Sequence, residues 1–140
     1  MAQDPVVKRV IAEFKRKAAK ARASEVAKDK RNNAAGNAWT VADNARKAAH
    51  AAWEASGHAD AEGETLSAAN TAEAKAHDRS ARAHYVWDDA DALLRAAEYD
   101  LEDALDCQTF ADLLGCENSK VRMETQFALN PAPPAPKRKR

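Results

Sequence analysis

The stretch ARKAAHAAWEASGHADAEG, residues 45–63, contains the strongest internal break in the chain. Alanine fills nearly half of it, which favours a helix, but Gly57 and Gly63 follow Trp53 closely. Glycine ends helices because it adopts backbone conformations that other residues avoid. We therefore predict that the chain reverses over residues 57–63, with Trp53 filling the wider space beside the turn.

Two long helices are predicted on either side of this turn. Proline occurs at Pro5 and then not again until Pro131, and the residues between them are mostly good helix formers. With Asp4 as N-cap, helix one covers about 5–56. Helix two covers about 64–114 and is capped by Gly115, before a short segment over 116–129 and a tail over 130–140. Gly36 costs about 1 kcal/mol against alanine inside helix one, so a kink there is an alternative.

Apolar residues recur at alternating spacings of four and three, as they do along the contact line of a coiled coil. Alanine supplies most of these positions and lets two helix backbones approach closely. The fold class predicted is therefore all-α, a long antiparallel two-helix coiled-coil hairpin in one domain over 1–129. One extra residue near Ser80 reads as a stutter in the second helix. The expected contact positions are Val7, Ile11, Phe14, Ala18, Ala21, Ala35, Trp39, Ala42, Arg46, Ala49 and Trp53 in helix one, and Ala69, Ala72, Ala76, Ala83, Trp87, Ala90, Leu94, Ala97, Leu101 and Ala104 in helix two.

The charge distribution gives independent support for the hairpin. The formal net charge is zero, but residues 1–31 are strongly basic and residues 88–106 are strongly acidic. A reversal near residue 60 brings residue i beside about 121 − i, which places Ile11 opposite Phe110 and Lys17 near Asp103. The basic run would then be neutralised within the chain and not by nucleic acid. A bent or three-helix arrangement is the alternative.

No signature of catalysis or of a metal site is found. His50, His58, His77 and His84 do not follow the Glu-x-x-His spacing of di-iron bundles, and no phosphate-binding loop or nucleophile motif is present. We expect no enzyme activity, no cofactor and no metal. Cys107 and Cys116 are too few for a disulfide framework, which favours a reducing compartment. No membrane span or secretory signal is expected, so the predicted location is the cytoplasm of the producing cell.

The candidate binding residues are aromatic or basic. Four aromatic side chains, Trp39, Trp53, Trp87 and Tyr85, are assigned to partner binding. The tail NPAPPAPKRKR ends in Lys137, Arg138, Lys139 and Arg140, which we assign to a polyanion or a protein partner. A tail that only adds solubility is the alternative.

The segment SAANTAEAKAHDRSARAHYVW, residues 67–87, resembles alanine- and histidine-rich helical-hairpin segments of phage structural or accessory proteins. This resemblance implies a structural role, possible presence in a virion, and assembly with itself or with a protein partner. The hairpin with Trp53 before its turn, and with Tyr99 and Asp103 further on, is also similar to the secreted WXG-type family. Here the turn reads Trp53-Glu54-Ala55-Ser56-Gly57 in place of Trp-x-Gly.

From these observations we expect a non-enzymatic structural or interaction protein, phage- or virion-associated, that assembles through alanine-rich helical faces. An alanine seam buries little area per residue, so further helices are needed for stability and a homo-oligomer is expected. The alternatives are a nucleic-acid-associated accessory protein anchored by its basic tail and a secreted WXG-like hairpin protein.

Overall fold

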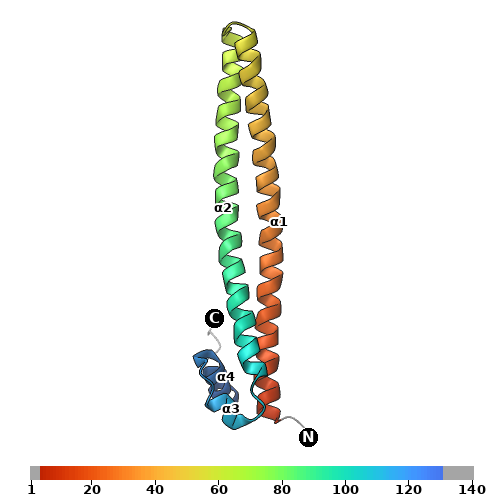
Figure 1. The fold of residues 1–140 in the computed structure, drawn as a ribbon, viewed down its shortest axis with the longest axis vertical. Coiled ribbons are helices and arrows are strands. Elements are labelled where there is room, and N and C mark those ends of the chain that lie inside the picture. Colours follow the sequence, from red (N-terminus) through yellow and green to blue (C-terminus); the bar gives the residue numbers. More distant parts are fainter. Residues whose placement is uncertain (1–3, 131–140) are drawn as a thin grey trace, which may run out of the picture. The chain divides into compact units, whose positions relative to one another are not determined.

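The computed structural model describes residues 4–130, and all of its regular structure is helical (Figure 1). The four helices are α1 (Pro5–Ala55), α2 (Asp60–Leu105), α3 (Phe110–Leu114) and α4 (Ser119–Leu129). The two long helices pack closely against each other, which confirms the helical hairpin predicted from the sequence. The predicted tail, including Lys137 to Arg140, lies outside the described residues.

The chain divides into two compact units. Residues 1–22 and 93–140 form the terminal unit, and residues 23–92 form the central unit. The terminal unit contains α3, α4 and the adjoining ends of α1 and α2, and the central unit contains the hairpin turn.

The terminal unit has a well-packed core. Val7, Val10 and Phe14 of α1 are almost completely buried and cluster with Leu113 of α3 and Val121 of α4. Most of the large apolar side chains buried among residues 4–130 lie in this unit, because the sequence concentrates these residue types near its two ends.

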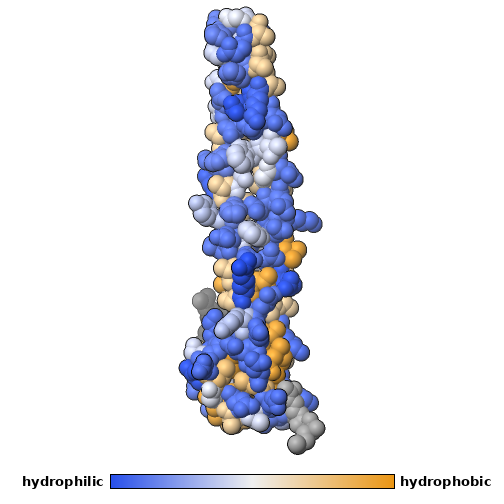
Figure 2. Space-filling view, in the orientation of Figure 1, coloured by the Kyte–Doolittle hydropathy of each residue, from blue (hydrophilic) through white to orange (hydrophobic). Residues whose placement is uncertain are grey.

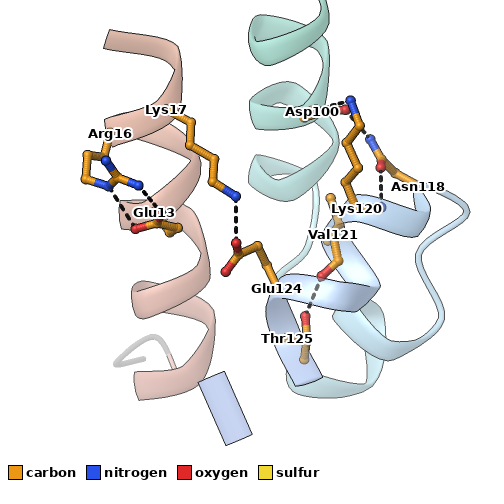
Figure 3. Close-up of polar contacts among 9 residues, drawn as sticks. All are labelled: Glu13, Arg16, Lys17, Asp100, Asn118, Lys120, Val121, Glu124 and Thr125. Atoms are coloured by element: carbon orange, nitrogen blue, oxygen red, sulfur yellow. Dashed lines mark hydrogen bonds and ion pairs between the residues drawn. The ribbon is translucent and has the colours of Figure 1, made fainter. Parts of the chain in front are cut away.

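Polar contacts join the same elements at the surface of the terminal unit (Figure 3). Lys17 Nζ of α1 lies 2.6 Å from Glu124 Oε1 of α4, and Asn118 donates to both Asp100 and Asp103 of α2 at 2.9 Å. Within the terminal unit, α4 and its N-cap therefore contact both α1 and α2, which a simple two-helix prediction does not include.

The central unit is packed much more thinly. Among the described hydrophobic residues of 23–92, Ala90 is the only one in the fully buried class. The residues that face the partner helix are mostly small or polar, and all but Trp39, which is 37% exposed, are half-buried. They follow an unbroken alternation of three and four, along Glu25, Lys28, Asn32, Ala35, Trp39, Ala42, Arg46, Ala49 and Trp53 in α1 and along Leu66, Ala69, Glu73, Ala76, Ser80, Ala83 and Trp87 in α2.

The stutter predicted near Ser80 is wrong. Ala72, which we assigned to the contact line, is exposed, whereas Glu73 is half-buried. Glu73 reaches the facing helix by a hydrogen bond with Trp39, so a polar residue occupies a position for which the sequence pattern selects alanine.

The hairpin turn is shorter than predicted and is built by a specific C-terminal cap. His58 N donates to Trp53 O at 3.0 Å and Gly57 N donates to Glu54 O at 3.2 Å, the two bonds of a Schellman motif. Gly57 has φ 72° and His58 has φ 70°, so the chain leaves α1 through two successive left-handed residues. Helix α2 then begins at Asp60 and not at 64, which places Gly63 inside the helix.

The prediction that helix two runs to 114 is also wrong, because α2 ends at Leu105. Thr109 caps α3 instead. Asp112 N donates to Thr109 Oγ1 at 3.1 Å, and the Asp112 carboxylate accepts the backbone N–H of Thr109 at 3.1 Å and that of Gln108 at 3.0 Å. This capping box starts a new helix, and Gly115 caps α3 as predicted for the FADLL segment.

At the other end, α1 begins as predicted, since Asp4 Oδ1 accepts the Val6 N–H at 2.8 Å. The helix continues through Gly36 without a break. The predicted register needs correction: Trp39 contacts Glu73, whereas the sequence rule places it beside residue 82. The earlier turn accounts for this shift.

Candidate interaction face on the central unit

Two of the tryptophans assigned to partner binding join the two helices of the central unit. Trp39 Nε1 of α1 donates to Glu73 of α2 at 2.9 Å, and Trp87 Nε1 of α2 donates to Glu25 of α1 at 3.1 Å. Trp39 also contacts His77 edge-on at 4.8 Å between ring centroids. These indoles are therefore engaged within the hairpin.

Trp53 lies at the turn, as predicted. Its ring stacks on His58 with centroids 4.0 Å apart, and it also contacts His50 at 6.0 Å. A Cβ placed on Gly63 would lie 3.5 Å from Trp53 Nε1, which shows that the indole packs over the start of α2. The His58 ring reaches Glu54 at 3.2 Å, so local contacts hold this aromatic cluster together.

Tyr85 differs from the tryptophans because it is 71% exposed. Of the four aromatic residues assigned to partner binding, it is the most available to an outside molecule. Lys137, Arg138, Lys139 and Arg140 lie outside the described residues.

A second line of small apolar residues runs along α1 and does not face α2. These residues occur at alternating spacings of four and three, and every one is exposed. Each of the first six directly precedes one of the α1 residues that face α2, which form the inner contact line. The second line is therefore rotated by about 100° around the helix from the inner contact line. We call this line the alanine face; it consists of Ala34, Ala38, Val41, Ala45, Ala48, Ala52 and Ala55.

The positions on both sides of the alanine face carry no charge. Ala35, Ala42 and Ala49 occupy one flank, and Asn37, Asn44 and Ala51 occupy the other. Such an uncharged surface contrasts with the chain as a whole, in which 31% of residues are charged. Val41 is 69% exposed at the middle of this face.

The same side of the hairpin continues onto α2 near the turn. Three exposed residues of α2 directly precede its contact positions: Thr65, Ala68 and Ala72. In an antiparallel pair, the residues that precede the contact positions of the two helices lie on the same side, so these three extend the side of the alanine face. Further along α2 the same positions are Lys75 and Arg79, so the uncharged surface ends there. Pale orange surface near the turn in Figure 2 marks weakly hydrophobic residues of the central unit.

The basic residues of the first helix are partly neutralised within the chain. Arg22 forms an ion pair with Glu98 of α2, which agrees with the predicted meeting of the basic and acidic runs. Lys17, however, pairs with Glu124 of α4 and not with the acidic run near Asp103. Arg16 pairs with Glu13 on its own helix at an N–O distance of 2.5 Å.

A pocket of about 570 Å³ lies in the terminal unit and is lined in part by Asp103, Asp106, Cys107, Asp112 and Cys116. Within residues 4–130, no three histidine, cysteine or acidic side chains are arranged to hold a metal ion. None of the helices between residues 4 and 130 is both long and apolar enough to cross a membrane.

No protein-family model, curated protein or solved structure matches this chain. The site must therefore be interpreted from its own residues. Sequence reasoning identified the alanine-rich helices but assigned a single contact line to each helix, and so missed the alanine face. The repeated spacing at 34, 38, 41, 45, 48, 52 and 55 was the available signal.

Proposed function

We propose that this protein is a non-enzymatic assembly protein whose alanine face binds the alanine face of a second copy. The observation that carries the proposal is the uncharged, exposed line of small residues from 34 to 55. A role in a phage or virion, implied by the sequence resemblance, belongs to the same proposal.

The packing of the central unit supports this function. Its inner contact line contains Glu25, Lys28, Asn32 and Arg46, so it removes little apolar surface from water. A pair of helices joined by such a line is weakly stabilised by itself, and a further helix on the alanine face would add buried area.

A second copy is the partner that this surface fits best. Two helix backbones can approach closely only if both helices present small side chains at the contact. The alanine face of a second copy meets this condition. Without charges on either flank, two identical faces meet without like-charge repulsion, as a two-fold symmetric contact requires.

The test is the mass of the full-length protein in solution, measured by light scattering or sedimentation equilibrium across a range of concentrations. We expect the wild type to form a dimer or a larger oligomer. The Ala45→Glu variant should be monomeric at the same concentrations, because it places a charge in the middle of the contact.

Ala74→Glu is the matched control. Ala74 is an exposed alanine of the central unit on the opposite side of the hairpin, so the same change there should leave the mass unaltered. Both variants should keep the helical circular dichroism of the wild type, since both positions are exposed. A monomeric wild type that unfolds cooperatively would contradict the proposal, as would an Ala45→Glu variant that still associates.

A further inference from the structure

Cys107 and Cys116 lie at the two ends of the short helix α3. Cys107 follows α2 in the segment before Thr109, and Cys116 directly follows the capping residue Gly115. Both thiols are free, and both line the 570 Å³ cavity of the terminal unit. Helix α3 thus brings two cysteines that are nine positions apart in the sequence to one site.

The two thiols line the same pocket and are close enough for Cys116 to affect the pKa of Cys107. Cys107 belongs to the buried core and is 6% exposed, and Cys116 packs against that core but is only half-buried. Cys107 Sγ also donates to Asp103 O at 3.5 Å. Cys116 is therefore the more accessible of the two thiols.

The two cysteines differ in reactivity. Burial, and after it the neighbouring Cys116, Asp112 and Asp106, together raise the pKa of the Cys107 thiol to about 11. Little Cys107 thiolate is therefore present at neutral pH, and the thiolate is the form that attacks a disulfide. Cys116 is the residue that an outside oxidant meets first.

We propose that Cys107 and Cys116 form a thiol–disulfide exchange site that closes to an intrachain disulfide with a low-molecular-weight disulfide such as oxidised glutathione. The Cys116 thiolate attacks one glutathione sulfur, forms a mixed disulfide and releases one glutathione thiolate. Cys107 then loses its proton to solvent, attacks the Cys116 sulfur and releases the second glutathione thiolate. The protein loses two hydrogens, and one oxidised glutathione becomes two reduced glutathiones.

The disulfide would close a loop that contains only α3 and its caps. The ends of this loop are already held by the capping box at Thr109 and Asp112, and by the bonds from Gly115 N to Ala111 O at 2.9 Å and from Cys116 N to Leu113 O at 3.4 Å. Closure therefore requires little rearrangement, and it would couple the end of α2 to the start of α4 through a covalent bond.

The experiment treats the full-length protein with excess oxidised glutathione, traps free thiols by alkylation and maps the products by mass spectrometry. We expect a monomeric product that lacks two hydrogens, carries no glutathione and contains a peptide cross-linked between Cys107 and Cys116. Cys107→Ala should stop at a stable glutathione adduct on Cys116. Cys116→Ala should react much more slowly, because only the buried thiol remains.

The dependence on pH provides a second, independent measurement. The conversion of the mixed disulfide to the internal disulfide should accelerate about tenfold per pH unit from pH 7 to 9, because the thiolate fraction of Cys107 rises by that factor below its pKa. The charged groups close to this thiol are Asp106 and Asp112, with Asp103 on the adjoining turn of α2.

A wild type that accumulates the Cys116 adduct without an internal disulfide would overturn the proposal, as would one that forms only disulfides between chains. Equal rates for Cys116→Ala and wild type would overturn the order of the two steps. The wild-type product alone decides whether the disulfide forms, so the result does not depend on whether the variants fold.

Discussion

The indole Nε1 of Trp39 on α1 lies 2.9 Å from Oε1 of Glu73 on α2. An equivalent bond runs in the other direction, from Trp87 of α2 to Glu25 of α1 at 3.1 Å. The spacing from Trp39 to Trp87 equals that from Glu25 to Glu73, so each helix contributes one tryptophan and one glutamate at equivalent positions. These two bridges link the helices of the central unit where the small side chains provide little other packing.

Replacing either tryptophan by phenylalanine should destabilise the protein. Trp87→Phe keeps an aromatic ring but removes the N–H that Glu25 accepts, and we expect a loss of about 0.5–1.5 kcal/mol in the free energy of unfolding. Urea unfolding at a fixed protein concentration measures this loss, and the concentration must be fixed because association shifts stability.

Tyr85→Phe is the control, because it changes an exposed aromatic residue two positions away. Its unfolding should differ from the wild type by less than about 0.5 kcal/mol. Two results would show that the hydrogen bond does not stabilise the hairpin. One is a Trp87→Phe variant whose free energy of unfolding is as little changed as that of Tyr85→Phe. The other is a double variant with Glu25→Gln that loses twice as much stability as Trp87→Phe alone.

The glycines at 36 and 57 should respond in opposite directions to alanine. Gly36 is inside α1, and an added Cβ would have no atom within 4 Å, so Gly36→Ala should stabilise the protein by about 0.5–1 kcal/mol. Gly57 has a positive φ, so Gly57→Ala should destabilise it by about 1 kcal/mol through strain at the Schellman cap. Thermal unfolding of the two variants beside wild type tests the contrast, and equal shifts would show that the turn conformation is wrong.

The sequence predicted the hairpin because two properties agreed: the spacing of apolar residues and the opposite charges at the two ends. It did not predict where α2 ends, because Gly115 after FADLL was taken as the cap of one continuous helix, although Thr109 and Asp112 form a capping box before it. The contact positions taken by Glu73 and Ser80 also could not be found by searching for alanine, and Glu73 holds its position by a hydrogen bond with Trp39 of the facing helix.

The ion pair between Lys17 and Glu124 should hold α4 against α1 by a modest amount. Its N–O distance is 2.6 Å, but the Lys17 side chain is 43% exposed, so the pair is screened by solvent. We expect Lys17→Glu to destabilise the protein and Lys17→Glu with Glu124→Lys to recover most of the loss. Urea unfolding of the single and double variants should give a coupling free energy of about 0.2–1 kcal/mol. This coupling should become smaller when the salt concentration is raised from roughly 0.05 M to roughly 0.5 M.

Partial rescue by Asp103→Lys in place of Glu124→Lys would restore the pairing first predicted from the sequence. It would count against the contact seen in the structure. A coupling that does not change with salt would mean that the two variants act through packing.

The capping box of α3 should make this helix sensitive to acid. Backbone N–H groups of Gln108 and Thr109 donate to the Asp112 carboxylate, and together with the Thr109 side chain they lower the pKa of Asp112 below its ordinary value. A carboxyl group with a lowered pKa in the folded state stabilises the fold fully above the pKa of the unfolded chain, near 4, and this contribution is lost as pH falls through the lower folded value. We therefore expect the cap of α3 to open in that acidic window.

The measurement is the chemical shift of the Gln108 and Thr109 amides, followed by NMR from about pH 6 to 2. Both amides should titrate together, with a midpoint below that of an unperturbed aspartate. Asp112→Asn should abolish this titration, because an amide oxygen carries no charge to lose. Asp106→Asn changes a carboxylate of the same segment to which neither amide donates, so it should preserve the titration. If the two amides do not titrate in the wild type, or titrate at the ordinary value, the carboxylate does not hold the start of α3.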